Sequence, residues 1–371
     1  MDAQRENRRD KDHAEVTGRK LLYVCAGAKT ELLPDADIES LLLSTASNFG
    51  TEGNTKKAEA LIQAVHPGLL MLDSGGYQIL STEQQGVVMT FDAEQPLRCT
   101  RRYLNIAPLH VVQTAMEIKA DCMIALDFPV RKLKGADECE REFREKIDRN
   151  VAWAIETAAL RKEMCPDIEF LIPVQAYNLR QFEEFYRRIM HVDCDGLSLP
   201  VRNLSMVEIA QFFREMHGIG IRNVHILGSS SLPTIIVCAY MSRLFDRITF
   251  DSTSWRMSAQ WGEFINPEDL TYTRLTDASV SNRHARCFCA GCQGRTLDDI
   301  AKLERQKQTT ALINHNYLAI QNLTRKFEKA SVSMDFVKRF LAESRRGDKQ
   351  RILRSMEEIE TICGTAVRRA A

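Results

Sequence analysis

The segment at residues 169–227, EFLIPVQAYNLRQFEEFYRRIMHVDCDGLSLPVRNLSMVEIAQFFREMHGIGIRNVHIL, contains the repeating unit that decides the fold. Three short apolar runs in it are typical of buried β-strands: residues 169–174, 196–199 and 224–227. The two stretches between these runs, 179–190 and 206–217, have the apolar spacing of amphipathic helices. Short strands that alternate with helices along a chain indicate βα units and a parallel sheet.

The same alternation extends over most of the chain. Further apolar runs lie at residues 21–27, 68–72, 122–126 and 247–250, and a further helical pattern lies at residues 150–163. At least seven buried strands over roughly 250 residues fit a (β/α)8 TIM barrel better than a doubly wound sheet. No Gly-x-Gly-x-x-Gly sequence follows the first run, which argues against a dinucleotide-binding domain. We therefore predict an α/β fold in which a catalytic (β/α)8 barrel occupies residues 20–280.

Composition and charge narrow the class of protein. The 371 residues are 44% hydrophobic, which is enough for a substantial core, and 50 Lys and Arg residues balance 50 Asp and Glu residues. The balance argues against a binder driven by net charge. The 11 cysteines are odd in number and mostly scattered, which is typical of free thiols in a reducing compartment. Residues 1–19 read as a disordered polar arm without the apolar region of a signal peptide. We expect a cytoplasmic protein with no membrane association.

Residues 287–292, Cys-Phe-Cys-Ala-Gly-Cys, place three thiols within six positions. Zinc is held by four ligands in a tetrahedron, and three Cys with one His are a common structural set. His284 and His315 are the candidates for the fourth ligand. His284 lies so close to the first Cys that closing the tetrahedron would strain the loop, and we prefer the second candidate. The predicted structural zinc ligands are Cys287, Cys289, Cys292 and His315.

The alternative for this cluster is a redox pair. A thioredoxin-like Cys-x-x-Cys should open a helix after a strand, whereas Gly291 and Gly294 favour a turn. We assign residues 281–335 to a zinc-binding subdomain with helices and residues 336–371 to a basic helical tail. The tail has nine Lys or Arg residues and five Asp or Glu residues. Such a stretch is either a solvated helix face or a contact for nucleic acid.

Polar residues follow several predicted strands, at the end where barrel enzymes place their chemistry. Asp73, Asp127 and Asp251 each come directly after a strand or end one, and Gln175 follows another. Two other acids, Asp121 and Asp246, precede their strands and are predicted to lie at the opposite end of the barrel. The sequence therefore predicts three carboxylates at one mouth.

Three acids that converge repel one another, so the arrangement needs a function. One candidate is a metal site. The other is catalysis at an anomeric carbon, where one carboxylate attacks the sugar and a second transfers the proton of the leaving group. Each single Asp can also be a helix N-cap. Two glycines after Asp73 let the backbone approach a flat ligand, on which Tyr77 can stack if it is not a core aromatic.

Together these residues resemble the tRNA-guanine transglycosylase superfamily. The resemblance runs from about residue 21 to about residue 322 and rests on two specific motifs. The first is Asp-Ser-Gly-Gly-Tyr-Gln at residues 73–78, and the second is the Cys-x-Cys-x-x-Cys sequence followed by His315-Asn316. The resemblance implies a (β/α)8 barrel with a zinc subdomain that helps to seat the nucleic acid. It implies structural zinc and no organic cofactor.

The resemblance also implies roles for the site residues. Asp251 matches the nucleophile that attacks C1′ and expels guanine, and Asp73 matches the acid/base that protonates the departing base. Asp127 matches the acid that binds the guanine edge, whereas Gln175 and the Gly196 amide match contacts to the base oxygen. The remaining substrate-binding matches are pocket residues: Ser74, Tyr77 on the base face, and Leu197 beside the matched glycine. The incoming base would be a 7-deazaguanine.

The chain departs from the family in segments that bind the nucleic-acid substrate. Bacterial queuosine enzymes follow the nucleophile with a Thr-Arg, Gly- and Arg-rich loop, whereas this chain has Ser-Thr-Ser-Trp-Arg at residues 252–256. Archaeal enzymes carry further C-terminal RNA-binding domains, for which too few residues follow His315. We therefore favour DNA over tRNA as the substrate, as in the branch that inserts 7-cyano-7-deazaguanine into DNA. Candidate phosphate contacts are the tail and the cluster Arg98, Arg101 and Arg102.

Three alternatives stay open at this point. The first is a tRNA-guanine transglycosylase of the queuosine or archaeosine type. The second is a non-catalytic partner subunit, against which the presence of both Asp73 and Asp251 argues. The third is a metal-dependent hydrolase, which would need a His cluster at the strand ends that the sequence lacks. A homodimer or helper proteins are possible partners.

Overall fold

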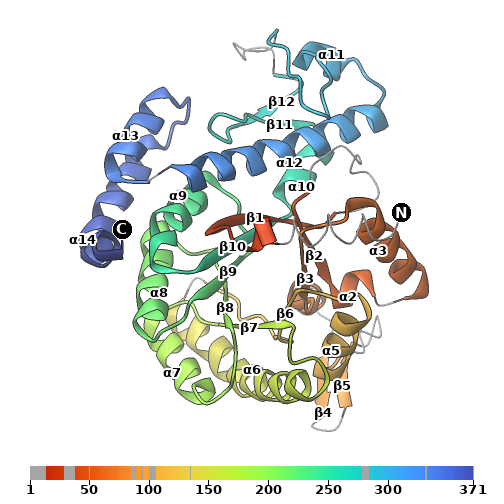
Figure 1. Ribbon diagram of the computed structural model, residues 1–371, viewed down its shortest axis with the longest axis vertical. Coiled ribbons are helices and arrows are strands. Elements are labelled where there is room, and N and C mark those ends of the chain that lie inside the picture. Colours follow the sequence, from red (N-terminus) through yellow and green to blue (C-terminus); the bar gives the residue numbers. More distant parts are fainter. Residues whose placement is uncertain are drawn as a thin grey trace.

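The computed structural model describes residues 14–28, 38–49, 51–84, 89–92, 95–99, 106–133, 135–277, 284–330 and 332–370. Parallel strands close into a barrel in the order β1-β10-β9-β8-β7-β6-β3-β2 (Figure 1). The strands are β1 (Leu21–Ala26), β2 (Ser40–Ser44), β3 (Leu69–Asp73), β6 (Cys122–Ile124), β7 (Glu169–Pro173), β8 (Gly196–Pro200), β9 (Asn223–Leu227) and β10 (Arg247–Ser252). This closed sheet confirms the predicted (β/α)8 barrel.

One barrel strand was missing from the seven apolar runs read in the sequence. It is β2, Ser-Leu-Leu-Leu-Ser, whose apolar run is only three residues long and lies between two serines. Ser40 is buried nonetheless, because its hydroxyl donates to the Tyr23 carbonyl of the neighbouring strand at 2.9 Å. Strand β2 pairs with β1 on one side and β3 on the other, and so closes the barrel.

Helices cover the outside of the barrel (Figure 1). They are α3 (Glu52–Val65), α4 (Gly76–Gln84), α5 (Pro108–Glu117), α6 (Ala136–Met164), α7 (Leu179–Ile189), α8 (Met206–Gly218) and α9 (Leu232–Met241), with the short α2 (Thr45–Asn48) after β2. The helix predicted at 150–163 is the second half of α6. Helices α7 and α8 lie where the spacing predicted them. A capping box between Ser205 and Glu208 begins α8.

The carboxyl-terminal part of the described chain adds a second layer beside the barrel. It contains α10 (Ser254–Gln260), the antiparallel pair β11 (Glu263–Ile265) and β12 (Tyr272–Arg274), α11 (Leu297–Ala301), α12 (Arg305–Lys329), α13 (Met334–Glu343) and α14 (Lys349–Ala370). A small hairpin, β4 (Met89–Asp92) and β5 (Gln95–Cys99), lies apart from the barrel. Figure 1 shows α12 lying across the barrel beside β1 and α10, with α13 and α14 next to α9 and α8.

The basic tail is helical, as α13 and α14 show, and it is packed against the rest of the protein. One stripe of α14 is buried, through Ile352, Met356, Ile359, Cys363 and Val367. The Cys363 thiol lies 3.7 Å from the Ala210 carbonyl oxygen of α8. Residues 1–13 of the predicted polar arm, and the side chains of the predicted Arg98, Arg101 and Arg102 cluster, lie outside the described residues. Within the described helices, none combines the length and apolar character that crossing a bilayer requires.

A buried charge cluster fixes the loop that follows β6. Lys146 and Glu142 of α6 are both buried, and the Lys146 ammonium donates to the Glu142 carboxylate and to the Pro129 carbonyl. Arg131 adds a two-pronged contact to Glu142, at 2.9 and 2.7 Å. Asn150 binds both backbone groups of Phe128, at 2.7 and 2.9 Å. The loop that carries Asp127 is therefore held by the side chains of a long helix.

Replacing Glu142 by Ala removes the carboxylate of this cluster and leaves the Lys146 ammonium buried without it. We expect the free energy of unfolding to fall by about 3–5 kcal/mol, because an uncompensated buried charge is strongly destabilising. Urea unfolding monitored by circular dichroism measures the change. The matched control is Glu145→Ala on the exposed face of the same helix, which should have an effect within about 0.5 kcal/mol. Equal effects of the two variants would contradict the role of the cluster.

Candidate active site and metal centre

The three acids predicted at strand ends lie at one end of the barrel. Asp73 ends β3, Asp251 lies near the end of β10, and Asp127 follows β6. The charges of Asp127 and Asp251 both act on the pKa of Asp73, so the three groups share one electrostatic environment. Asp121, which precedes β6, lies at the opposite end of the barrel, where its carboxylate accepts from the Leu70 amide at 2.7 Å.

Asp73 is the acid whose protonation is most strongly perturbed. Burial raises the pKa of Asp73 to about 8, and the negative charges of Asp127 and Asp251 contribute to the rise. A hydrogen bond from the Gly75 amide to Oδ2, at 3.1 Å, opposes it. Gly75 has a φ of +103°, and a Cβ at this position would lie 2.4 Å from the Ala46 Cβ. The sequence therefore needs glycine here for the turn that delivers this amide.

Asp127 is buried and accepts hydrogen bonds at both carboxylate oxygens. The Ser74 hydroxyl donates to Oδ1 at 2.7 Å, and the Gln175 amide nitrogen donates to Oδ2 at 2.5 Å. Burial raises the pKa of Asp127 to about 6, although these hydrogen bonds partly offset the rise. The Gln175 carbonyl accepts from the Val130 amide at 3.0 Å, which fixes the orientation of the side chain. A Cβ on Gly76 would lie 2.5 Å from Asp127 Oδ1, so the second glycine lets α4 approach this carboxylate.

Asp251 is buried and is held from the neighbouring strand β9. Its Oδ1 accepts from the Gly228 amide at 2.9 Å and lies 3.4 Å from His225 Nε2. The sequence interpretation placed neither contact at the site. Period-2 alternation along β9 gives the signal, because it places His225 on the same face of the strand as Leu227, inside the barrel.

A cluster of hydroxyl groups lies next to Asp251. Ser252 Oγ lies 2.5 Å from Ser230 Oγ and 2.8 Å from Ser254 Oγ, and the latter two oxygens are 3.1 Å apart. The Trp255 indole donates to the carbonyls of Ala26 and Ser252, at 3.2 and 3.0 Å. These contacts fix the turn from β10 into α10.

The other predicted pocket residues, Tyr77, Gly196 and Leu197, differ in whether their side chain or their backbone is accessible to a ligand. Tyr77, in the first turn of α4, is 62% exposed. Gly196 allows β8 to pack tightly on β9, because a Cβ there would lie 2.2 Å from the Asn223 carbonyl oxygen. The Leu197 side chain is fully buried in the main core, so a ligand contact at this position would come from its backbone.

The predicted zinc ligands meet in one cluster. The sulfur atoms of Cys287, Cys289 and Cys292 lie 3.4, 3.3 and 3.4 Å from His315 Nδ1, and all four ligand atoms lie within 4.8 Å of one another. A tetrahedral zinc with bonds of about 2.3 Å to sulfur and about 2.0 Å to nitrogen requires S···N separations of about 3.5 Å. The donor set and its spacing therefore fit zinc. His284, the rival ligand, instead contacts Asp298 at 3.0 Å and is exposed.

The rest of the centre orients His315. Its Nε2 lies 2.9 Å from the Ile265 carbonyl, which makes Nε2 the donor and leaves Nδ1 for the metal. The ring stacks on Phe264 at a centroid distance of 3.8 Å. Residues 287–292, which carry the three thiols, are called the Cys turn below. A Cβ on Gly291 would lie 2.4 Å from the Ala311 carbonyl oxygen, so glycine lets this turn lie directly on α12.

Asn316 connects α12 to the segment that follows Asp251. Its carbonyl oxygen accepts from the Ile265 amide at 2.8 Å. Its amide nitrogen donates to the carbonyls of Trp255 and Glu263, at 3.1 and 3.0 Å. Trp255 belongs to α10, which directly follows the strand of Asp251. The helix that carries His315 is therefore tied to the segment that follows Asp251.

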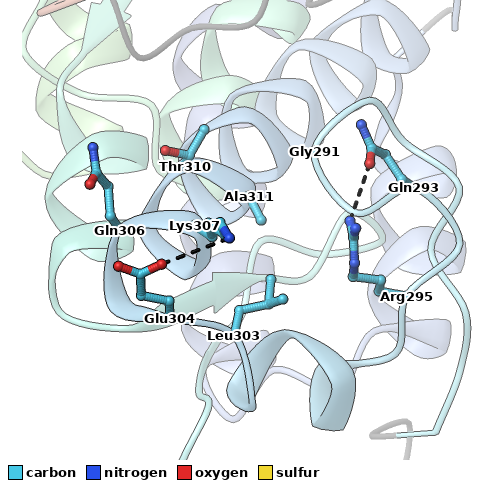
Figure 2. A pocket seen from close by; sticks show the side chains of 9 residues that line it. All are labelled: Gly291, Gln293, Arg295, Leu303, Glu304, Gln306, Lys307, Thr310 and Ala311. Atoms are coloured by element: carbon cyan, nitrogen blue, oxygen red, sulfur yellow. Dashed lines mark hydrogen bonds and ion pairs between the residues drawn. The ribbon is translucent and has the colours of Figure 1, made fainter.

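A separate cavity of about 430 Å³ lies between the Cys turn and the first residues of α12 (Figure 2). It is lined by Gly291, Gln293, Arg295, Leu303, Glu304, Gln306, Lys307, Thr310 and Ala311. Its charged groups contact other lining residues. Arg295 donates to the Gln293 side chain at 3.3 Å, and the Lys307 ammonium lies 3.8 Å from Glu304. None of the three strand-end carboxylates lines it, so this cavity is distinct from the candidate active site.

Replacing Cys289 by Ala tests the metal centre. We expect bound zinc and the free energy of unfolding to fall together, the latter by roughly 3 kcal/mol or more, because metal binding contributes directly to folding. Elemental analysis by mass spectrometry and urea unfolding measure the two quantities. Cys194→Ala, outside the cluster, is the control that should keep the metal. Wild-type protein that purifies without zinc would contradict the assignment.

Comparison with known proteins agrees with this geometry. Residues 36–347 match the family model described as queuine tRNA-ribosyltransferase. Over 297 residues the chain is 25% identical to the tRNA-guanine(15) transglycosylase of Aeropyrum pernix, an alignment that covers 76% of this chain and 49% of that protein. The chain thus spans about half the length of the curated relative that it matches. Since the family model covers most of the barrel and the metal centre, the chain belongs to the queuine tRNA-ribosyltransferase family.

Proposed function

We propose that this protein exchanges guanine in a nucleic acid for a 7-deazaguanine through a covalent intermediate on Asp251. The observation that carries the proposal is the contrast among three carboxyl groups at one mouth. Asp251 is held by one oxygen, Asp127 accepts hydrogen bonds at both oxygens, and Asp73 has a pKa of about 8. Acidic groups whose environments separate their protonation behaviour are typical of paired catalytic roles.

In the first step an Asp251 carboxylate oxygen forms a bond to C1′ of the target nucleotide. The bond between C1′ and the purine N9 breaks, and its electron pair goes to the base. Asp73 donates its proton to a ring nitrogen of the departing base. The raised pKa of Asp73 supports this role, because a carboxyl group with a pKa of about 8 is mostly protonated at pH 7. The nucleotide must be turned out of a duplex or loop for this step.

In the second step the incoming base occupies the same pocket. Asp73, now a carboxylate, takes the N9 proton, and N9 forms a bond to C1′. The bond between C1′ and the Asp251 oxygen breaks, which restores the Asp251 carboxylate and the protonated Asp73. Nucleophile and acid/base therefore return to their starting states without a redox step or a further reactant.

Base recognition is proposed for Asp127, Gln175 and Gly196. An ionised carboxylate offers about four lone-pair sites, so Asp127 can accept from the guanine N–H donors while it keeps its bonds to Ser74 and Gln175. The Gln175 amide nitrogen has a second hydrogen for the base oxygen, and the Gly196 amide is proposed for the same oxygen. Tyr77 is proposed to cover the base face, which its exposure at the start of α4 permits.

We assign the zinc a structural role. Four protein ligands complete a tetrahedron and leave no open position for substrate or water. Bound there, the metal links the Cys turn to α12, and Asn316 connects α12 to α10. A metal-dependent hydrolase built on the three strand-end carboxylates is less well supported, since among the described residues these carboxylates do not form a group close enough to share a metal ion.

The polymer is proposed to be DNA, with 7-cyano-7-deazaguanine as the incoming base. The support is the segment after Asp251, Ser-Thr-Ser-Trp-Arg at residues 252–256, which differs from the Thr-Arg, Gly- and Arg-rich loop of the bacterial queuosine enzymes. A tRNA substrate is the second candidate, and the printed descriptions of the matching family and relative support it. Incubation of the protein with labelled base and tRNA, single-stranded DNA or duplex DNA, followed by nucleoside mass spectrometry, discriminates between them.

Replacing Asp251 by Ala should abolish both base incorporation and a covalent protein–nucleic acid adduct on a denaturing gel, because the oxygen that attacks C1′ is gone. The fold should persist, as circular dichroism can show. The matched control is Asp246→Ala, an exposed acid at the opposite end of the same strand, which should keep wild-type rates. Full incorporation by the Asp251 variant would refute the assignment of the nucleophile.

The rate of adduct formation should depend on pH in two directions. It should rise as the pH increases through about 6, where Asp127 becomes the carboxylate that accepts from guanine. It should fall as the pH increases through about 8, where Asp73 loses the proton it donates. Single-turnover rates between pH 5 and pH 9.5 measure the profile. Asp127→Asn should remove the rising limb, and a rate that stays constant through pH 8 would exclude Asp73 as the acid.

A further inference from the structure

The barrel interior is mostly apolar, but two buried polar side chains lie beneath Asp251. Side chains such as Leu22, Val24 and Met71 pack together inside the barrel. His225 of β9 and Thr249 of β10 lie opposite each other in the parallel register and are 0% and 3% exposed. Burying two polar side chains where apolar ones would pack is unfavourable unless their hydrogen bonds serve a purpose.

The two ring nitrogens of His225 face different side chains. Its Nδ1 lies 2.7 Å from Thr249 Oγ1, within hydrogen-bond distance. Its Nε2 lies 3.4 Å from Asp251 Oδ1, and in the part of the chain that the structure describes Nε2 has no hydrogen-bond partner. Catalytic hydrogen bonds are often long before substrate binds and shorten afterwards. The imidazole thus connects a buried hydroxyl to the carboxylate proposed as the nucleophile.

The chemistry of these groups decides where the ring proton lies. If Thr249 donates its hydroxyl hydrogen to Nδ1, the ring proton lies on Nε2 and points at the Asp251 carboxylate. In the opposite arrangement Nδ1 donates to Thr249, and the Nε2 lone pair would face a carboxylate lone pair in a buried site. The first arrangement is attractive and the second repulsive. Thr249 therefore selects the tautomer that donates to Asp251.

We propose that His225 and Thr249 position Asp251 by holding Oδ1, so that Oδ2 is the oxygen that attacks C1′. The Gly228 amide holds Oδ1 from the other strand at 2.9 Å, whereas Oδ2 accepts no hydrogen bond from the described residues. A carboxylate fixed in this way cannot rotate to exchange its oxygens, which favours a productive approach to the sugar. The inference rests on the proposed function, because it assigns a role within the same reaction.

The contacts that run from Thr249 through His225 to Asp251, called the relay below, also suit both halves of that reaction. When Oδ2 bonds to C1′, Oδ1 becomes the carbonyl oxygen of the ester, keeps the hydrogen bond from the Gly228 amide and accepts one from His225 Nε2 as that 3.4 Å contact shortens. When the bond between C1′ and Oδ2 breaks, the electron pair returns to the carboxylate, and the same two donors stabilise its charge. His225 gives up no proton in either step. It is thus a positioning residue, whose partner is the oxygen that does not react.

Substitutions separate this role from a merely structural one. His225→Leu should lower the single-turnover rate of adduct formation roughly 10- to 100-fold, the range expected for loss of a hydrogen bond to a charged group. The dissociation constant for the polymer should not change, because the nucleic acid does not contact this residue. His225→Gln keeps an N–H donor at a similar reach and should recover most of the rate. His191→Leu, an exposed histidine just after α7, is the matched control with wild-type rate.

The tautomer gives a readout that does not depend on activity. Nitrogen-15 spectra of the zinc-loaded protein, assigned by the His225→Gln variant, should show the His225 proton on Nε2. Thr249→Val removes the hydroxyl and should shift the proton partly to Nδ1. A wild-type spectrum with the proton on Nδ1, or a His225→Leu variant with wild-type adduct rates, would overturn the relay. If wild-type protein forms no adduct with any polymer, the proposed function fails, and the nitrogen spectrum alone decides the relay.

Discussion

The repulsion among three carboxyl groups in a partly desolvated mouth is the constraint on which the rest of the site depends. Asp73, Asp127 and Asp251 cannot all be buried as bare anions, so each needs a different compensation. The Gly75 amide donates to the first, Ser74 and Gln175 to the second, and the Gly228 amide to the third. Burial raises the pKa of Asp73 to about 8 and that of Asp127 to about 6, and the hydrogen bonds to each carboxylate partly offset the rise.

Each donor is in turn fixed by elements far from the mouth. Gln175 is oriented by the Val130 amide, and the loop of Val130 is held by the charge cluster on α6. On the other side, Asn316 joins α12 to the Trp255 carbonyl, and His315 joins the same helix to the Cys turn. The protein therefore stabilises the two halves of the site by different means. Buried ion pairs support the loop that carries Asp127, and the Cys and His cluster supports the segment after Asp251.

The sequence predicted the features that depend on local pattern. Buried strands followed by an acid placed Asp73, Asp127 and Asp251 at one end of a barrel, and the spacing of the three cysteines indicated a metal site. The features that it missed depend on register or on partners distant in sequence. The apolar run of β2 is only three residues long, and the first half of α6 is rich in charged residues that hide its buried face. The contact of His225 with Asp251 requires the pairing of β9 with β10, which no local pattern specifies.

Barrel closure between the first and last strands has a consequence for biosynthesis. Strand β1 pairs with β10, and the Tyr23 hydroxyl contacts Ser252, 229 positions later. A chain emerging from the ribosome therefore carries β1 unpaired on one edge until almost the entire barrel has been synthesised, and such long-range pairing is slow. The three thiols emerge after β10 but before His315, so the nascent chain exposes an incomplete thiolate cluster. Closure of the sheet and completion of the Cys and His cluster therefore both wait for residues that are synthesised late.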